Sequence, residues 1–378
     1  MNEQQWNTLL DVIHGKRMST LPTGFIIDCP WLPGWYGVNM LDYFSNNECW
    51  FTANKKAIET FPDTIFLPGF WAEYGMCTEP SAFGAKCRWH TTNMPHAEKV
   101  LKDLTEVELL SKPDVRTDGL LPFVIYRLRN TRPQMEALGH HIKFAVARGA
   151  LNIASFLVGA TELMMAMMTN PNRCHKLMQM ITDFLMDWIS YQKEQFPSIE
   201  GIMLLDDIIG FIGDQQCREY VVPYCTKIFA SFDSKVNFLH NDANGLVSAP
   251  YLTQMGINLI NYSFEHSLQE LREKTNNQVA ILGNIPPRDV LAAGTPQDVQ
   301  QAVKQSVADL DDRSRLILSC GGGMPQGVPT ENIQAFITAA ESLGQVGHEL
   351  RSDSGQLPSI VVAEEPDSSP RIRKQKIT

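Results

Sequence analysis

The second half of the chain repeats one pattern, in which a short apolar run is followed by a longer segment with apolar positions at helical spacing. The runs predict buried strands at residues 202–207, 236–239, 257–262, 279–282 and 316–319. The segments that follow predict helices at residues 215–232, 246–255, 267–274, 288–293, 296–310 and 330–343. Five successive strand–helix units require parallel strands joined by helical crossovers.

The first half is less regular and supplies three further strand candidates, at residues 64–67, 123–126 and 144–147. Further helices are predicted at residues 2–14, 151–158, 161–168 and 171–194. A total of eight strands predicts an α/β protein with a single (β/α)8 TIM-type barrel. The alternative is a doubly wound open sheet, but no strand is followed by a G-x-G-x-x-G or P-loop sequence.

We expect the barrel to span residues 61–347. Residues 1–60 are predicted to form an N-terminal helical and irregular extension packed on the barrel, since residues 21–95 are rich in Pro, Gly and aromatic side chains. Residues 348–378 are rich in Ser, Asp, Pro and charged side chains, which predicts a flexible C-terminal tail.

Composition then removes several classes of function. A net charge of −10 without a basic stripe argues against nucleic acid as a partner. No apolar run approaches the length of about 20 residues that spans a membrane, so no membrane association is expected. Residues 1–5 are polar and unlike a secretory signal, so we expect a cytoplasmic protein. The eight cysteines are then interpreted as thiols rather than as a disulfide framework.

Candidate chemistry gathers at the carboxyl ends of the predicted strands, where barrels of this kind carry their active sites. The groups at or just past these ends are Glu73, Asp206, Asp207, His240, Asp242, Glu265, Asn284 and Cys320. We assign Glu73, Asp206 and Asp207 to catalysis, as groups that orient a substrate or move a proton. Two interpretations of Glu73 stay open: a helix-start carboxylate, or an acid whose pKa is raised in a cavity.

His240 and Asp242 are one residue apart at a strand end, so in strand geometry their side chains leave on the same face. Imidazole and carboxylate groups suit zinc, and Cys320 and Glu265 would complete a catalytic zinc set. The alternative for the first pair is a polar strand end hydrogen-bonded to its loop. The alternative interpretation of Cys320 is a small residue that is needed before a glycine run. The alternative interpretation of Glu265 is a carboxylate at a helix N-terminus.

Several motifs, in this order along the chain, resemble the uroporphyrinogen decarboxylase superfamily. They are Phe70-Trp71-Ala72-Glu73, Arg148-Gly149-Ala150, His240-x-Asp242, Gly283-Asn284-Ile285-Pro286-Pro287 and the run from Cys320 to Ile333. The resemblance covers residues 5 to about 345, and it implies a (β/α)8 barrel.

Two branches of that superfamily differ in their residues. True decarboxylases carry M-R-Q-A-G-R-Y near the start to hold the substrate carboxylates, whereas residues 25–36 here contain no arginine, which argues against uroporphyrinogen. The other branch comprises zinc-dependent, corrinoid-linked methyltransferases with His-x-Cys and a distant Cys as ligands. His240 and Cys320 are similar to two of these, and Asp242 stands in place of the third. Glu265 lies where cobalamin-independent methionine synthase, a more distant relative, has a zinc-ligating glutamate.

The resemblance implies a methyltransferase with Zn²⁺ that moves a methyl group between a small O-, N- or S-methylated compound and a corrinoid (cobalamin) carried by a partner protein. We expect Asn284, Tyr262 and Met324 to contact the substrate or the corrinoid. A metal-independent decarboxylase that uses Asp206 or Glu73 is the alternative, and a non-catalytic ligand-binding relative is a third. The methyl donor, the direction of transfer and a homodimeric assembly stay open.

Overall fold

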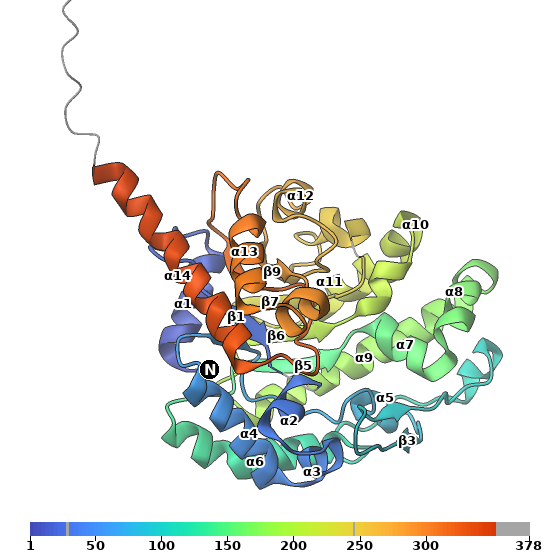
Figure 1. The fold of residues 1–378 in the computed structure, drawn as a ribbon. Helices are drawn as coiled ribbons and strands as arrows, with labels where there is room; N and C mark the ends of the chain where they lie inside the picture. The colour runs from blue at the N-terminus through green and yellow to red at the C-terminus, as the bar shows by residue number, and fades with distance from the viewer. Residues whose placement is uncertain (28–29, 245, 353–378) are drawn as a thin grey trace, which may run out of the picture.

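The computed structural model describes residues 1–27, 30–244 and 246–352, and parallel strands form a barrel at its centre (Figure 1). Six strands are hydrogen-bonded in the order β10-β9-β8-β7-β6-β5, and β1 pairs with β2. A parallel bridge between Thr23 and Leu318 places β1 beside β10. The barrel strands are β1 (Gly24–Ile26), β2 (Ile65–Leu67), β5 (Phe144–Arg148), β6 (Gly201–Leu205), β7 (Val236–His240), β8 (Leu259–Asn261), β9 (Ala280–Ile285) and β10 (Leu316–Cys320). The predicted α/β barrel class is confirmed.

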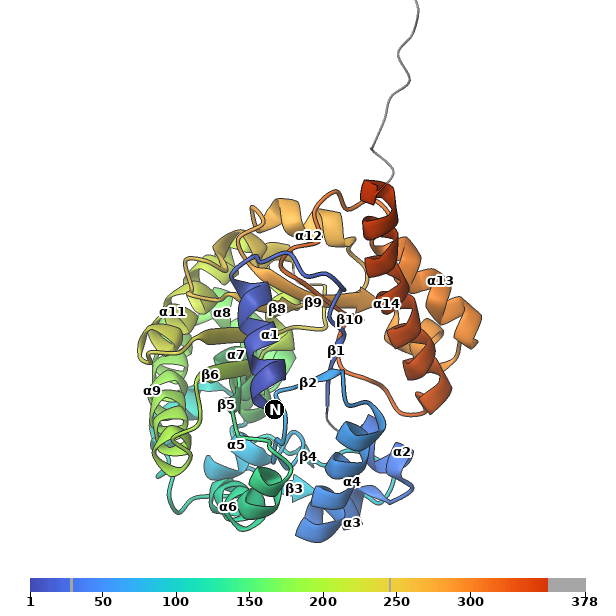
Figure 2. The same cartoon turned by 90° about the vertical axis from the view of Figure 1, so that its left-hand side faces the viewer.

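Helices surround the strands (Figure 2). The α-helices are α1 (Glu3–Ile13), α2 (Trp31–Tyr36), α3 (Met40–Ser45), α4 (Asn47–Thr60), α5 (Thr78–Ala82), α6 (Leu121–Ala137), α7 (Ala150–Val158), α8 (Ala160–Thr169), α9 (Pro171–Gln195), α10 (Asp214–Gln216), α11 (Val222–Ala230), α12 (Leu268–Lys274), α13 (Pro296–Ser306) and α14 (Thr330–Ser352). Short 3-10 or π segments are η1 (Leu104–Leu109), η2 (Asp207–Phe211), η3 (Cys217–Val221), η4 (Leu246–Tyr251) and η5 (Pro287–Ala292), and β3 (Cys87–Arg88) pairs antiparallel with β4 (His96–Ala97). In the described part of the chain no single helix could span a membrane; α7 and α8 meet the length and composition criteria only together, with a bend of 104°.

Residues 123–126, predicted as a strand, lie inside helix α6, so this prediction is wrong. Their branched and aromatic side chains suggested a strand, but burial follows helical spacing. Val124 and Leu128 are buried, whereas Phe123 and Tyr126 are exposed. A proline in the first turn, where its missing N–H costs nothing, starts the helix.

Strand β1 is the barrel strand that the sequence analysis missed, since three residues among Pro and Gly are too few to show a period. It lies within residues 1–60, so the range predicted as an extension also supplies a barrel strand. At the other end of the chain, α14 continues to Ser352. Residues 353–378 of the predicted tail lie outside the described residues.

The barrel interior is a separate apolar core that α1 closes at one end (Figure 2). On β7, Val236 and Phe238 belong to this core, so side chains of the same parity point inward. Trp6 of α1 is buried in the same core and meets Phe144 edge-on, with ring centroids 5.6 Å apart. Because α1 blocks the amino-terminal end of the strands, the opposite end is the one open to ligands.

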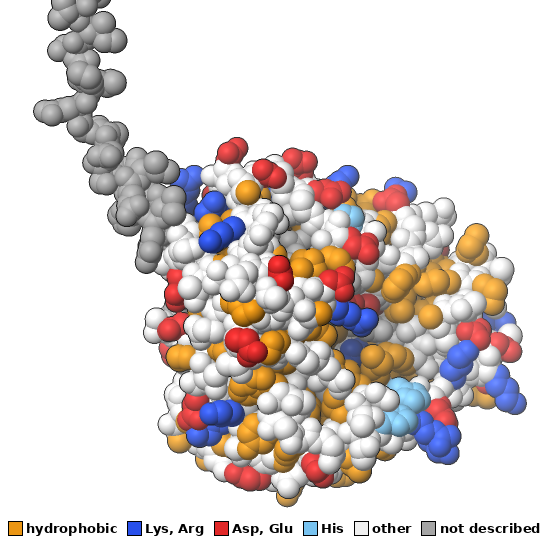
Figure 3. All heavy atoms as spheres, in the orientation of Figure 1, with side chains coloured by type: hydrophobic (Ala, Val, Ile, Leu, Met, Phe, Trp, Pro, Cys, Tyr) orange, Lys and Arg blue, Asp and Glu red, His pale blue; other side chains and the backbone are white. Residues whose placement is uncertain are grey.

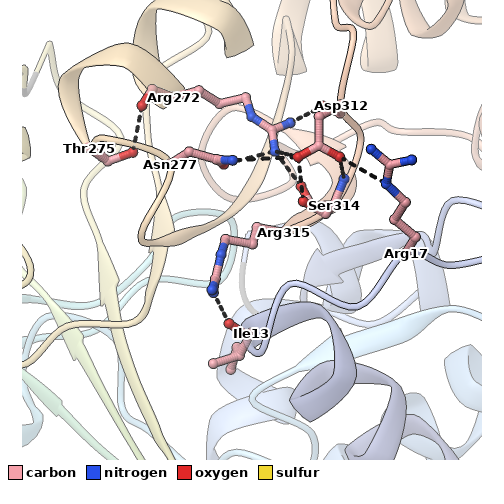
Figure 4. A network of polar contacts seen from close by, with 8 residues as sticks. All are labelled: Ile13, Arg17, Arg272, Thr275, Asn277, Asp312, Ser314 and Arg315. Carbon is pink, nitrogen blue, oxygen red and sulfur yellow. Dashed lines mark hydrogen bonds and ion pairs between the residues drawn. The ribbon is translucent and has the colours of Figure 1, made fainter.

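A polar network ties the end of α1 to the loops before β9 and β10 (Figure 4). The buried Arg272 guanidinium donates to the Ser314 carbonyl at 2.6 Å and pairs with the Asp312 carboxylate at 3.4 Å. Arg315 donates to the carbonyl of Ile13 at the end of α1. The network therefore holds the closed end of the barrel together.

Replacing Arg272 with alanine is expected to lower the free energy of unfolding by about 2 kcal/mol, because several charge-assisted hydrogen bonds of a buried group are lost together. Urea unfolding measures this change. Arg17→Ala is the control: Arg17 is exposed and its Nε lies 3.8 Å from Asp312 Oδ1, so it should cost less than about 1 kcal/mol. Equal losses for the two variants would contradict the role given to Arg272.

Candidate metal centre and active site

Three side chains at the open end of the barrel bring their ligand atoms together. Asp207 follows β6, His240 ends β7, and Asp242 follows β7. One ligand atom from each lies within 4.8 Å of the others, and no other set of three or more His, Cys, Asp or Glu residues in the described ranges is this close. The structure thus joins two residues predicted as metal ligands with one predicted as catalytic.

The orientation of His240 is set by the neighbouring strand. Asn261 of β8 donates through Nδ2 to the backbone carbonyls of Leu282 at 2.7 Å and Cys320 at 3.2 Å, so its Oδ1 is the atom that faces His240. His240 Nδ1 lies 2.8 Å from this oxygen and must therefore donate. In the neutral tautomer with the proton on Nδ1, Nε2 is the nitrogen that can act as a ligand, and it lies 3.9 Å from Asp207 Oδ1.

The two carboxylates of the group repel each other as long as no cation lies between them. The Asp242 backbone N–H donates to Asp207 Oδ1 at 3.1 Å, which holds the two residues side by side. Burial and then the charge of Asp207 raise the pKa of the Asp242 carboxyl, while His240 and Arg288 lower it. A divalent cation would relieve this repulsion, and two ligand atoms 3.9 Å apart can both lie about 2.1 Å from one ion.

The structure does not bring Cys320 or Glu265 into this group. On β10, Ile317 belongs to the barrel interior, whereas Leu318 and Cys320 belong to the core between barrel and helices. Cys320 therefore points outward, and its Sγ lies 3.4 Å from the carbonyl of Gly322. Glu265 is exposed, in the segment between β8 and α12.

The residue of the β10 loop that does face Asp242 is Gly322. A Cβ added there would lie 2.9 Å from Asp242 Cβ, and the φ angle of Gly322 is +104°. Both facts leave room only for glycine. The group around His240 therefore contains nitrogen and oxygen ligands and no thiolate.

Asp206 is adjacent to Asp207 in sequence but lies in a different environment. It is 2% exposed, and its Oδ2 accepts the backbone N–H of Leu151 in the first turn of α7 at 3.0 Å. Burial, and then the charge of Asp207, raise the pKa of Asp206 to about 8. A Cβ on Gly149 would lie 2.2 Å from Asp206 Oδ2, so a glycine is required at the start of α7 for the carboxyl to fit.

Glu73 lies in a second buried cluster, just past β2. Its Oε2 accepts a hydrogen bond from Arg148 Nη2 at 2.9 Å, and Glu79 accepts the backbone N–H of Arg148 at 3.2 Å. Burial raises the pKa of Glu73 to about 7 against the opposing effect of Arg148. Both glutamates line a cavity of about 10 Å³ with Trp188. Glu73 is therefore a buried acid, as one of its two sequence interpretations had it.

The three residues expected to contact substrate or corrinoid are enclosed. Asn284 is 8% exposed and donates through Nδ2 to the carbonyl of His266. Tyr262 is fully buried with its hydroxyl 3.1 Å from Ser248 Oγ, and Met324 is fully buried as well. Their contacts with a ligand stay a prediction.

Sequence reasoning missed Asn261, the residue that orients His240. Tyr262 was chosen at the end of the same strand, although the parity of the inward-facing Leu259 favours Asn261. The alternation of inward-facing and outward-facing side chains along β8 could therefore have identified Asn261.

The open end of the barrel carries large exposed hydrophobic side chains. Met165 and Met168 on α8, Phe211 on η2 and Phe264 after β8 are between 41% and 77% exposed. Figure 3 shows hydrophobic side chains along a hollow in this part of the surface. A pocket of about 520 Å³ lies at the rim and includes Arg288 among its lining residues.

Comparison with known proteins identifies relatives of this chain. Uroporphyrinogen decarboxylase of Actinobacillus succinogenes is 23% identical over 282 residues, which cover 72% of this chain and 77% of that protein. Methylated-thiol--coenzyme M methyltransferase of Methanosarcina mazei is 23% identical over 274 residues, 71% of each chain. A solved structure of a methyltransferase from Methanosarcina mazei aligns with a TM-score of 0.75 at 17% identity and covers 90% of this chain and 98% of its own. The profile of one family, described as uroporphyrinogen decarboxylase (URO-D), matches residues 36–343, and the chain therefore belongs to the URO-D family.

Proposed function

We propose that the protein is a metal-dependent methyltransferase that moves a methyl group between a small methylated compound and a corrinoid protein. The observation that carries the proposal is the group formed by Asp207, His240 and Asp242 at the open end of the barrel. Similarity to a methyltransferase of the same family supports the type of reaction.

The donor set fits a divalent cation such as zinc. Imidazole and carboxylate ligands suit zinc, and three protein ligands with one exchangeable position are typical of catalytic sites. The bond from His240 Nδ1 to Asn261 leaves Nε2 ready to ligate without a change of tautomer. Cys320 drops out of the proposed set, and Asp207 takes its place.

A cation bound there would polarise the heteroatom that carries the methyl group. Asp207, His240 and Asp242 would hold it, and Asn261 would fix the direction of the imidazole. Because the set has no thiolate, it suits an oxygen or nitrogen atom better than sulfur. We therefore propose an O-methyl or N-methyl compound as the donor.

The rim supports the proposed docking of a corrinoid protein. The exposed side chains of Met165, Met168, Phe211 and Phe264 give the open end of the barrel apolar surface that a partner protein could cover. Large exposed hydrophobic side chains that gather at one end of a protein are typical of interaction sites.

The test is methyl transfer to free cob(I)alamin, followed by the visible spectrum of the methylated cobalt. Protein loaded with zinc is mixed in turn with methanol, a methylamine, an aryl methyl ether and a methyl thioether. We expect methylation from an oxygen or nitrogen donor, and its loss after dialysis against a chelator. A metal-free protein, or one that methylates cobalt equally well after metal removal, would reject the proposal.

Decarboxylation is the second candidate, because several similar proteins are uroporphyrinogen decarboxylases. The buried acids Asp206 and Glu73, whose pKa values are raised to about 8 and about 7, could then supply a proton. Incubation with uroporphyrinogen and analysis of its products by mass tests this. Carbon dioxide release that is insensitive to chelator would favour decarboxylation over methyl transfer.

Replacing Asn261 with leucine is expected to weaken zinc binding by about 10-fold to 100-fold, as loss of the hydrogen-bond acceptor that orients a histidine ligand typically does. Competition with a chromophoric chelator measures the affinity. Ser248→Ala is the control, since it removes the contact with the Tyr262 hydroxyl without touching His240. Unchanged affinity in Asn261→Leu would mean that the amide does not orient the imidazole.

A further inference from the structure

The pocket of about 520 Å³ at the rim of the barrel has a cationic side chain in an otherwise uncharged lining. Among the described residues that line it, Arg288 is the one with a charge, Asn93 and Gln326 carry amides, and the walls include the apolar side chains of Met94 and Pro325. A pocket of this size and composition suits a small molecule with an apolar body and an anionic end.

The walls of this pocket are held together by a hydrogen bond between two loops. Gln326 belongs to the loop after β10, and its Nε2 donates to the carbonyl of Thr92, in the loop between β3 and β4, at 3.2 Å. Asn93 and Met94, on the other side of the pocket, directly follow Thr92. The pocket is therefore formed by tied segments and not by one free loop.

Arg288 is available to a ligand. It follows the two prolines after β9, lies in η5 and has an exposed side chain. Within the described part of the chain its guanidinium forms no ion pair and donates no hydrogen bond. The protein carries a net charge of −10, yet none of the described residues that line this pocket is acidic. The anion that would neutralise Arg288 can therefore come from a ligand.

The pocket lies beside the proposed metal group. Gly322, which faces Asp242 so closely that a side chain has no room there, belongs to the same loop as Pro325 and Gln326. The positive charge of Arg288 also lowers the pKa of Asp242. Since the guanidinium acts on that carboxylate through space, a ligand bound to Arg288 would lie next to the metal group.

The charges of the two neighbouring sites determine how such a ligand would be oriented. With a divalent cation bound, the two carboxylates of Asp207 and Asp242 cancel its charge, so the metal group has no net charge to attract an anion. Arg288 keeps its positive charge, and its planar guanidinium matches a carboxylate with two parallel N–H donors. The carboxylate end would therefore lie at Arg288, and the opposite end of the ligand could reach the metal group.

We propose that this pocket binds a small carboxylate ligand through Arg288 and that this ligand is the methyl donor. The second half of the statement rests on the proposed function, whereas carboxylate binding can be measured without any methyl transfer. Met94 and Pro325 would contact the apolar body of the ligand, and Arg288 would bind and orient it without taking part in the chemistry. The donor would then be a small methylated acid.

The experiment measures binding of 4-methoxybenzoate and 4-methoxybenzamide to the full-length protein by isothermal titration calorimetry, with and without zinc. The two probes share the ring and the methyl ether and differ in the charge of one end. We expect the carboxylate to bind about 10-fold more tightly, because a charge-assisted bidentate pair replaces a neutral contact, and to lose this preference as salt is added. Equal affinities, or no binding of either probe, would overturn the proposal.

Replacement of Arg288 assigns the preference to one residue. Arg288→Gln should remove it, so that both probes bind with the same affinity. Arg132→Gln is the matched control, because Arg132 is an exposed arginine on α6 that pairs with Glu136 at 3.4 Å, and it should keep the preference. A preference for the carboxylate that persists in Arg288→Gln would show that the anion binds elsewhere, for example on the metal, and would overturn the proposal.

Methyl transfer from 4-methoxybenzoate to cob(I)alamin separates this inference from the proposed function. Arg288→Gln should raise the KM for the donor by about 10-fold and leave the KM for cobalamin unchanged. A change in the KM for cobalamin alone would mean that Arg288 serves the corrinoid, which would overturn the proposal. A protein that binds the carboxylate through Arg288 but transfers no methyl group would reject the proposed function and still support the carboxylate site.

Discussion

From the proposed metal centre we predict that replacing His240 with alanine prevents binding of the divalent cation and abolishes the proposed methyl transfer. His240 Nε2 is the one nitrogen ligand of the group, and without it the neighbouring carboxylates of Asp207 and Asp242 face each other with no imidazole to complete the site. Loss of a residue that only orients a ligand costs about 10-fold to 100-fold in metal affinity, so loss of the ligand itself should cost more than about 100-fold. Metal analysis of protein purified without chelator and the cobalt methylation assay measure the two effects.

Cys320→Ser is the informative control for this prediction. Cys320 points into the core between barrel and helices, so the variant should keep its metal and its rate of methyl transfer. Should Cys320→Ser lose zinc as His240→Ala does, the group built on Asp207 would be wrong and a thiolate would have to belong to the site. Circular dichroism of both variants shows whether either loss comes from unfolding.

Asp207 belongs to the group around His240 and Cys320 does not, and this difference could not be predicted from the sequence. The spacing of His240 and Asp242 correctly placed both at one strand end, because the geometry of a strand is local. Whether a residue on another strand joins them depends on which face it occupies. On β10, Ile317 faces the barrel interior and Leu318 faces the surrounding helices, so Cys320 faces the helices as well. The sequence alone does not show which of the two alternating faces of a strand points into the barrel.

The fold was more predictable than the site, because the repeated strand–helix pattern in the second half of the chain indicates parallel strands joined by helices. Strands from β6 to β10 appear where apolar runs predicted them. The errors lie in the first half, where β1 is three residues long and residues 123–126 belong to α6. Tertiary packing decides such segments, since one buried face at helical spacing outweighs the strand preference of single side chains.

The carboxylates of the open end illustrate why composition could not assign roles. Asp206 and Asp207 are neighbours in sequence, yet one is enclosed at the start of α7 and the other faces His240. Burial raises the pKa of Asp206 to about 8, and its carboxyl accepts the backbone N–H of Leu151 in the first turn of α7. Asp207 is more exposed and remains available to bind a cation. The environment, and not the residue type, separates the two roles.

Lowering the pH from 6.5 to 4 is expected to destabilise the protein by about 3 kcal/mol through His140 alone. His140 is 8% exposed and packs edge-on against Phe70. Burial, then the positive N-terminus and His141, lower its pKa from 6.5 to about 4. Between these values the unfolded chain binds one more proton than the folded chain, so the free energy of unfolding falls by about 1.4 kcal/mol per pH unit.

His140→Gln removes this contribution, and urea unfolding of both proteins at several pH values from 7 to 4 measures it. Carboxyl groups also titrate in this range, as does the Met1 amino group, whose pKa burial lowers to about 5. These groups are common to both proteins, so the pH dependence of the difference comes mainly from His140. The stability of the variant relative to the wild type should therefore rise steadily as the pH falls from 6.5 to 4. His14→Gln, which changes an exposed side chain, is the matched control. A difference between wild type and His140→Gln that stays constant with pH would show that His140 is protonated in the folded protein as readily as in the unfolded chain.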